Sequence, residues 1–281
     1  MNIKRKIFIS LFLILILLTN LSFASYSTVT MNVVEEPVCT IELGENSKFE
    51  KKLISKDLNN KEVTLQLQVK NDEVVNKPTG EIMLVLDNSN SMNNTVDGTK
   101  TRKELIFDSA KTLVSNLLKD NKELKIGIVS FSTNTDISKE GSSEDANLVS
   151  SLSNDISKLN NAISNIKADG PKTNLESGLD LASEQFTKTD NNKYMIVLTD
   201  GVPNVALNYD KSYYSDDVIS KTKSKLQQLK QSNINIITML TGIDDETYIP
   251  ATTTKSFGEI IEEIFGTTSN PTVGKFYYVT D

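Results

Sequence analysis

The sequence predicts an α/β protein with a doubly wound, mostly parallel sheet flanked by helices, preceded by a small β-rich segment. From residue 81 onward, short and almost continuously apolar segments alternate with segments whose apolar residues recur every three or four positions. Continuous apolar runs indicate strands that are buried on both faces, as in a parallel sheet covered by helices. Before residue 79, by contrast, apolar and polar residues alternate as in half-exposed strands.

Residues 1–24 have the features of a secretory signal peptide. Three cations at residues 4–6 precede an apolar stretch of 12 residues at 7–18, and the small residues Ser22 and Ala24 in Ser22-Phe23-Ala24 provide a cleavage site. Such a stretch is short for a bilayer span, which takes about 20 residues, although an uncleaved membrane anchor is the alternative. We therefore expect a secreted or cell-surface protein that meets the membrane only transiently, through this peptide.

The composition excludes several classes of function. The formal charge of the 281-residue chain is −7, and removal of the three leader cations lowers it to −10, which argues against nucleic acid as a partner. The sequence has no histidine and one cysteine, Cys39. Histidine-based catalytic triads, zinc sites that rely on imidazole and an intrachain disulfide are therefore excluded. We expect Cys39 to be a buried apolar residue in a strand.

Residues 25–78 are predicted to form a β-rich flanking segment. Strand patterns occupy residues 27–34, 38–43 and 62–70, separated by turn residues. So few strands are marginal alone. The segment is either part of a β-sandwich stalk or a self-contained appendage of the main domain, and in both cases we interpret it as a spacer.

Residues 79–281 are predicted to form the main domain. A short edge strand is expected at 147–149. A doubly wound sheet normally gains a further helix after its last strand, so we expect this domain to be truncated at its C-terminus. The long strands are predicted at 81–87, 124–131, 194–200, 234–240 and 275–280.

The helices between these strands are predicted from apolar stripes at helical spacing, which we interpret as core packing. A further helical pattern covers residues 257–266. The stripes are Ile106, Ala110, Leu113 and Leu117; Ile156, Leu159, Ile163 and Ile166; Leu175, Leu179, Ala182 and Phe186; and Val218, Thr222, Leu226 and Leu229.

Oxygen-bearing side chains follow the strands of this domain. Asp87 and Asp200 end two of the strands, so both carboxylates should reach the edge of the sheet where ligands bind in open α/β folds. Ser89 and Ser91 follow Asp87 at alternate positions, and Thr173 precedes a helix. An ordinary polar turn would look similar. Two carboxylates and three hydroxyls nevertheless form a hard-oxygen set suited to Mg²⁺, with Mn²⁺ or Ca²⁺ as alternatives.

The motif DNSNS at 87–91 resembles the D-x-S-x-S element of von Willebrand factor type A domains. In that family a distant threonine and a distant aspartate complete a metal-ion-dependent adhesion site, and Thr173 and Asp200 match those positions. The resemblance covers about residues 80–281. It implies that the serines and the threonine contact the metal directly or through water, and that the aspartates often act through water. The sequence departs from the family at Pro171-Lys172, where small residues are common, and Lys172 could alter how a ligand approaches.

The resemblance implies an adhesion or protein-binding module rather than an enzyme. The expected partner is a protein of a host matrix or another surface protein, whose exposed Asp or Glu completes the metal shell. One alternative is a metal-dependent phosphohydrolase, but the haloacid-dehalogenase type needs a second aspartate where Ser89 stands. A second is a structural subunit of a surface or pilus assembly. A third, the intracellular branch of the family, conflicts with the export signal.

Three tyrosines follow the Asp200 loop, at Tyr209, Tyr213 and Tyr214. Rigid amphipathic side chains near a binding edge are suited to partner contacts. The alternative interpretation is that they pack on the next helix.

Overall fold

The computed structural model describes residues 29–32, 39–44, 47–57, 62–71, 79–96, 98–119, 121–243 and 245–279. The signal peptide expected at 1–24 lies outside these residues. The chain divides into two compact units, a β unit at Ile16–Lys77 and an α/β unit that contains Pro78–Asp281. Within the described stretches, no helix is both long and apolar enough to cross a membrane.

The β unit is one antiparallel sheet of four strands in the order β1-β4-β3-β2. Its strands are β1 (Val29–Asn32), β2 (Cys39–Gly44), β3 (Ser47–Asp57) and β4 (Glu62–Asn71). The sequence did not predict β3, because Lys51-Lys52 breaks its alternation of apolar and polar residues. Cys39 lies in a strand as predicted, while the burial predicted for its side chain lies outside what the structure describes.

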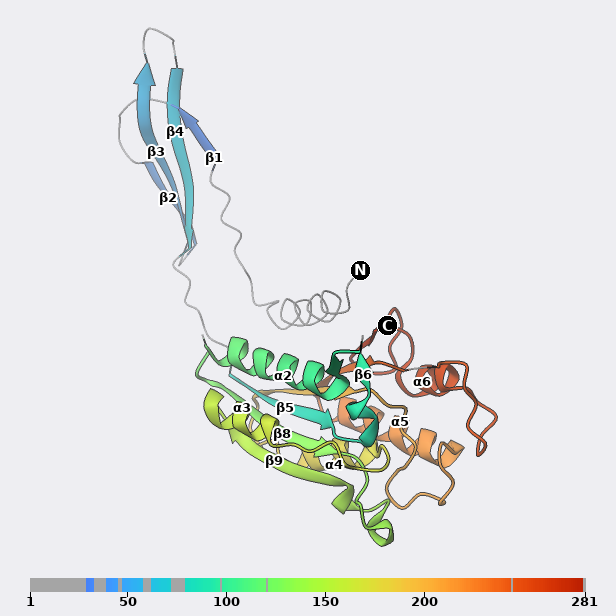
Figure 1. Ribbon diagram of the computed structural model, residues 1–281. Coiled ribbons are helices and arrows are strands. Elements are labelled where there is room, and N and C mark those ends of the chain that lie inside the picture. Colours follow the sequence, from blue (N-terminus) through green and yellow to red (C-terminus); the bar gives the residue numbers. More distant parts are fainter. Residues whose placement is uncertain are drawn as a thin grey trace. The chain divides into compact units, whose positions relative to one another are not determined.

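The α/β unit contains a six-stranded sheet in the order β12-β11-β10-β5-β8-β9. All neighbours are parallel except β9, which runs antiparallel to β8 (Figure 1). This confirms the five long strands and the predicted edge strand, which is longer than expected. The strands are β5 (Gly80–Asp87), β8 (Leu124–Phe131), β9 (Ala146–Ser153), β10 (Asn192–Thr199), β11 (Ile234–Thr241) and β12 (Lys275–Val279).

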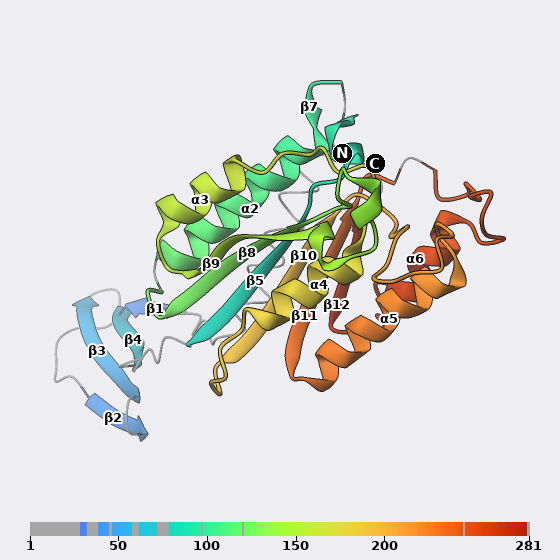
Figure 2. The same cartoon turned by 90° about the horizontal axis from the view of Figure 1, so that it is seen from below.

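Helices lie on both faces of this sheet, which confirms the doubly wound α/β architecture. Figures 1 and 2 show one face covered by α2 (Arg102–Lys119) and α3 (Ile156–Ser164). The other face is covered by α4 (Leu175–Glu184), α5 (Asp216–Gln231) and α6 (Phe257–Phe265).

The predicted stripe of α2 was wrong at Leu117, which is only partly buried, whereas Val114 and Leu118 are buried. Ile156 and Phe186 are also only partly buried. A stripe of apolar residues shows the general direction of the core. It does not show which of two neighbouring apolar side chains faces the sheet.

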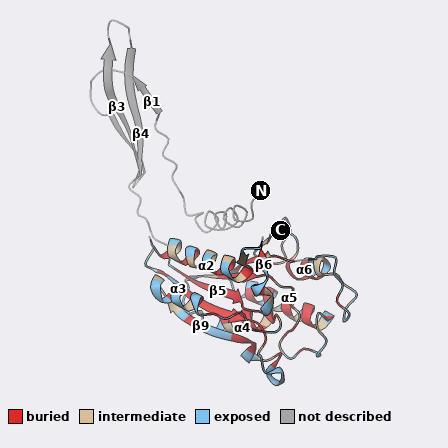
Figure 3. Cartoon of the chain, in the orientation of Figure 1, coloured by how far each residue is buried: buried red, intermediate tan, exposed pale blue. Residues whose placement is uncertain are grey.

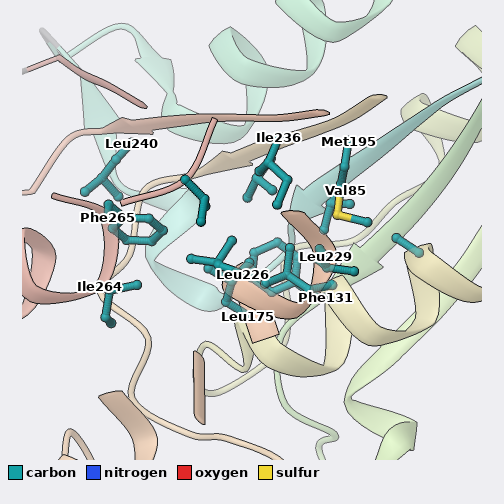
Figure 4. Close-up of a cluster of buried hydrophobic side chains, with 14 of the residues drawn as sticks. Val85, Phe131, Leu175, Met195, Leu226, Leu229, Ile236, Leu240, Ile264 and Phe265 are labelled. Atoms are coloured by element: carbon teal, nitrogen blue, oxygen red, sulfur yellow. The ribbon is translucent and has the colours of Figure 1, made fainter. Parts of the chain in front are cut away.

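The core lies between the sheet and the helices. β5 is buried along its whole length, whereas the edge strand β9 is exposed at several positions (Figure 3). On the α4 to α6 side, apolar residues of the strands meet those of the helices (Figure 4). The side chains labelled there include Val85, Met195 and Ile236 from the sheet and Leu175, Leu226, Leu229, Ile264 and Phe265 from the helices.

The strand order reverses at β5. The chain proceeds from β5 to β8 on one side and later reaches β10 on the other side. Leu86 of β5 pairs with Leu198 of β10, so the two strands end side by side. This reversal is the place where open α/β sheets form ligand sites.

Candidate metal site

The loop after β5 is tightly anchored at this edge of the sheet. It contains a single 3-10 turn, η1 (Asn90–Asn93). The backbone N–H of Asn90 donates to Gly170 O at 2.8 Å, and Asn93 Nδ2 donates to Ala168 O at 2.6 Å. The side chain of Asn88 also reaches across, to Lys167 O at 3.1 Å. The loop that carries the two serines is therefore fixed to the segment that leads to Thr173.

Asp87 is fully buried at the end of β5. Its Oδ1 accepts the backbone N–H of Ser89 at 2.8 Å, and its Oδ2 accepts the Thr199 hydroxyl. The Ser89 and Ser91 hydroxyl oxygens lie 3.0 Å apart, so these alternate residues point to the same side of the turn.

Asp200 follows β10 and joins the same cluster. Its Oδ1 accepts the Ser91 hydroxyl at 2.9 Å, and its Oδ2 accepts from Arg102 Nη1 at 3.1 Å. Its side chain is completely buried, and that of Arg102 is 5% exposed. A chain of contacts thus runs from Ser89 through Ser91 and Asp200 to Arg102.

Thr173 completes the arrangement from the other side. Its backbone is held by Asn204, whose Oδ1 accepts the Thr173 N–H at 2.9 Å. A Cβ atom placed on Gly201 would lie 3.0 Å from Thr173 Oγ1 and 3.7 Å from Asp87 Oδ2. Both oxygens therefore border the small space over Gly201, which the absence of a side chain keeps open.

The electrostatics of the cluster suit a cation. Burial raises the pKa of Asp87, although hydrogen bonds from Ser89 and Thr199 oppose the shift. Burial and the negative charge of Asp87 raise the pKa of Asp200 to about 7, against the opposing effects of Ser91 and Arg102. Two buried carboxylates that disfavour each other's charge are stabilised by a positive ion between them.

The donor set also fits a hard divalent ion. The described residues contain no group of three or more His, Cys, Asp or Glu side chains placed to hold a metal, so any ion here depends on the hydroxyls. Carboxylate and hydroxyl oxygens are ligands that Mg²⁺ accepts, usually with some of its water retained. Here they surround the space that Gly201 leaves free of side-chain atoms. The structure brings all five predicted residues to one edge of the sheet, namely Asp87, Ser89, Ser91, Thr173 and Asp200.

Sequence reasoning missed three residues of this site. Thr199 bonds to Asp87, Asn204 holds the Thr173 backbone, and Arg102 bonds to Asp200. Arg102 and Asp200 are 98 positions apart. One signal could have identified Arg102, because it is the only arginine after residue 24.

Lys172, singled out from the sequence, is held within a cluster beside Thr173. Its Nζ donates to Glu140 Oε2 at 2.6 Å and lies 4.3 Å from the centre of the Tyr213 ring. Tyr209 and Tyr213 donate their hydroxyls to Glu140 Oε1. Glu140 is buried, so its carboxylate fixes Lys172 near the metal-site edge.

Packing on the next helix, α5, is confirmed for Tyr209 and Tyr213, whereas Tyr214 packs on α6 (Phe257–Phe265) instead. Tyr209 is 5% exposed and packs with Val205, Ala206 and Val218, a residue of α5. Tyr214 lies against Phe257, with ring centres 5.3 Å apart. These side chains pack inside the protein and hold the loop in place. The spacing of tyrosines in a sequence does not distinguish such packing from contact with a partner.

Comparison with known proteins agrees with this architecture. Residues 82–202 match the family model of the von Willebrand factor type A domain. The pilus adhesin SpaC from Lactobacillus rhamnosus GG is a structural match with a TM-score of 0.61 and 17% identity, covering 85% of this chain and 34% of SpaC. The search of curated proteins gave no match.

Two further structural matches come from pilus proteins. The vWF domain of the type V pili tip protein Mfa5 from Porphyromonas gingivalis has a TM-score of 0.51 and 13% identity, covering 72% of this chain and 90% of that domain. The minor pilin PilB from Streptococcus sanguinis has a TM-score of 0.52 and 13% identity, covering 91% of this chain and 74% of PilB.

At these identities the matches show the fold alone. The chain spans about a third of the length of SpaC. The SpaC and PilB alignments cover more of the chain than the α/β unit contains, so they include residues of the β unit.

Proposed function

We propose that this protein is an exported surface or pilus-associated module that binds a protein partner through a divalent ion, and the match of residues 82–202 to the von Willebrand factor type A family model supports this. In this proposal Asp87, Ser89, Ser91, Thr173 and Asp200 hold the ion. Mg²⁺ is the first candidate, and Mn²⁺ or Ca²⁺ are the alternatives.

One observation carries the proposal, namely the convergence of these oxygens on the edge where the strand order reverses. The Ser89 and Ser91 hydroxyls are 3.0 Å apart, and Ser91 contacts Asp200. Thr173 and Asp87 border the same space over Gly201. The residues come from three separate loops, and a solvated polar turn would not explain why the other two loops meet it.

The expected partner group is a carboxylate. A bound divalent ion would supply an electrophilic centre for an oxygen of the partner. Asp87 and Asp200 are the two carboxylates of the set, and the three hydroxyls are neutral, so an acidic side chain completes the shell favourably. The proposed partner is therefore a protein with an exposed Asp or Glu, from a host matrix or another surface protein.

Three kinds of support favour a surface location. The expected signal peptide directs export, and the named structural relatives are a pilus adhesin, a pilus tip protein and a minor pilin. The chain's acidity suits an exported protein that binds neither nucleic acid nor anionic membranes.

A structural role in a surface or pilus assembly is the second candidate. The PilB match, which covers 91% of this chain including part of the β unit, favours it. If the role is structural, substitution of the oxygen-cluster residues should leave assembly unchanged. If the protein binds its partner through the metal, the same substitutions should abolish binding.

A metal titration with matched variants tests the proposal. Mg²⁺ should raise the melting temperature of the wild-type protein. Ser89→Ala should need an at least tenfold higher Mg²⁺ concentration for the same rise. Ser138→Ala is the control, because that serine is exposed and bonds to Asp136 away from the cluster. An identical response of wild type and Ser89→Ala would contradict the proposed site.

Binding is then measured against immobilised surface proteins with Mg²⁺ or with a chelator. Metal-dependent adhesion predicts that the chelator and Ser89→Ala both abolish capture. Capture that survives both treatments, together with normal assembly, would favour the structural subunit instead.

A further inference from the structure

The distribution of arginine in this chain is uneven. The sequence contains 28 lysines and two arginines, Arg5 in the expected signal peptide and Arg102. Lysine thus supplies the positive charge almost everywhere else. Arginine has a planar guanidinium that stays charged when buried and is weakly hydrated, so it suits buried ion pairs better than lysine does.

Arg102 is placed on the oxygen cluster by local structure. It is the first residue of α2 and follows the short hairpin of β6 (Thr95–Val96) and β7 (Lys100–Thr101). Its backbone N–H donates to Asn94 O at 2.9 Å, which ties it to the end of the serine loop. The N-terminal end of α2 therefore lies at the same edge of the sheet as the cluster (Figure 1).

The guanidinium is enclosed and directed at Asp200. Nη1 lies 3.1 Å from Asp200 Oδ2, and the two side chains are 5% and 0% exposed. Gly242 also lies against the guanidinium, because an added Cβ there would come 2.6 Å from Arg102 Nε. Glycine at that position leaves room for the guanidinium, so two elements far apart in the sequence accommodate it.

Other cations in α2 and just before it have different partners. Lys100 and Lys111 pair with Asp108 on the exposed side of the helix. Lys103 lies over the ring of Phe107, 5.7 Å from its centre. The Arg102 contact with Asp200 is therefore a specific placement and not a general property of a basic helix end.

We propose that Arg102 is a resident cation of the metal site. Its guanidinium neutralises the negative charge of Asp200 when no divalent ion is bound, and it weakens binding of the ion by electrostatic repulsion. This inference rests on the proposed function, because it needs an ion beside Asp200. Its physical basis is that a guanidinium and a divalent ion interact with the same carboxylate and repel each other. Arg102 is thus a positioning residue that sets metal affinity and keeps the empty site folded.

The test compares Arg102→Gln with Lys103→Gln. Both variants remove one positive charge from the same turn of α2, but only the first removes it from the cluster. Calorimetric titration with MgCl₂ gives the dissociation constant, and thermal melting is recorded without metal and at saturating Mg²⁺. Arg102→Gln should bind Mg²⁺ at least tenfold more tightly, and its melting temperature should fall more without metal than with it. Lys103→Gln should match the wild type in both measurements.

A purely structural role for Arg102 gives a different result. The melting temperature would then fall equally with and without Mg²⁺, and the dissociation constant would be unchanged. Either that result or weaker Mg²⁺ binding by Arg102→Gln overturns the inference. In both of these cases the wild type still binds Mg²⁺, so the proposed function stands while the inference fails. If neither the wild type nor Arg102→Gln binds an ion, both the proposed function and the inference fail.

A measurement on the wild type covers the case in which Arg102→Gln does not fold. With ¹⁵N-labelled arginine the chain has at most two Nε–H signals, and Arg102→Lys identifies the one from Arg102. Addition of Mg²⁺ should shift that signal along a saturable curve that matches the calorimetric titration. A signal that stays in place while Mg²⁺ binds overturns the inference.

Discussion

Gly201→Ala should remove metal binding while leaving the fold intact. The φ angle of Gly201 is not in the left-handed region, so alanine fits the backbone, and the loss of unfolded-chain entropy contributes about 0.4–1 kcal/mol of stability. The new methyl would lie 3.0 Å from Thr173 Oγ1 and 3.7 Å from Asp87 Oδ2. The first contact is tight, and the two effects should nearly cancel in the free energy of unfolding.

The same methyl fills the space between oxygens that we propose as ligands. A Mg²⁺ ion needs oxygen atoms at about 2.0–2.1 Å, which leaves no room for a carbon beside both. We expect Mg²⁺ affinity to fall about 100-fold, which equals about 2.7 kcal/mol.

The assay is the Mg²⁺-dependent rise in melting temperature. At a concentration 100 times the wild-type dissociation constant, the ion stabilises the folded state by about 2.7 kcal/mol. For a domain of this size, about 1 kcal/mol shifts the melting temperature by roughly 2–4 °C. The wild type should therefore gain about 5–10 °C, and Gly201→Ala at the same concentration only about 1–2 °C.

Gly80→Ala is the matched control. Gly80 starts β5 at the opposite edge of the sheet, and an added Cβ there would lie 3.3 Å from a Leu124 methyl carbon, a similarly tight contact. It should leave the Mg²⁺ response unchanged. A full Mg²⁺ response of Gly201→Ala would show that the ion does not bind between Thr173 and Asp87, and the reasoning on the site would be wrong.

Three further predictions concern the surroundings of the site. Asn204→Ala leaves the Thr173 N–H without its acceptor, so calorimetry should show Mg²⁺ affinity reduced about tenfold, as for other groups that orient metal ligands; an unchanged affinity would contradict this role. Glu140→Gln removes the buried charge that holds Lys172, and chemical denaturation should show a loss of about 1–3 kcal/mol with metal affinity unchanged. The free energy of unfolding should also depend on pH through the protonation of Glu140. Burial raises the pKa of its carboxyl, but bonds from Lys172 and Tyr209 outweigh this and hold the pKa below the usual 4.5. This stabilisation is complete above pH 4.5 and is lost as pH falls through the lowered pKa, and the loss should be smaller in Glu140→Gln.

Much of the fold could be predicted because burial leaves a clear pattern in the sequence. β5 is buried at every position and its middle residues, 82–86, are all apolar, so both the strand and its central place were predictable. β3 was not, since Lys51 and Lys52 interrupt the alternation that marks a half-exposed strand. A strand paired on both sides by backbone bonds can tolerate such charges.

The oxygen cluster was predictable for a topological reason. Parallel strands end at the same edge, so residues that follow β5 and β10 had to meet if those strands were neighbours. The contacts of Thr199 and Arg102 with the two aspartates needed more than this. The two residues of each contact are more than 90 positions apart in the sequence. No local sequence pattern indicates which side chains will meet at such a separation.

The site is built so that the fold does not depend on the ion. Each oxygen of Asp87 already has a donor, the Ser89 N–H or the Thr199 hydroxyl. Each oxygen of Asp200 likewise accepts from Ser91 or Arg102. Small domains with structural zinc sites differ, because their folding free energy comes from metal binding and the chain unfolds without it. A chelator should therefore leave the far-ultraviolet circular dichroism of this protein unchanged while it lowers the melting temperature. Unfolding at room temperature on removal of divalent ions would show that these protein contacts are too weak to hold the edge.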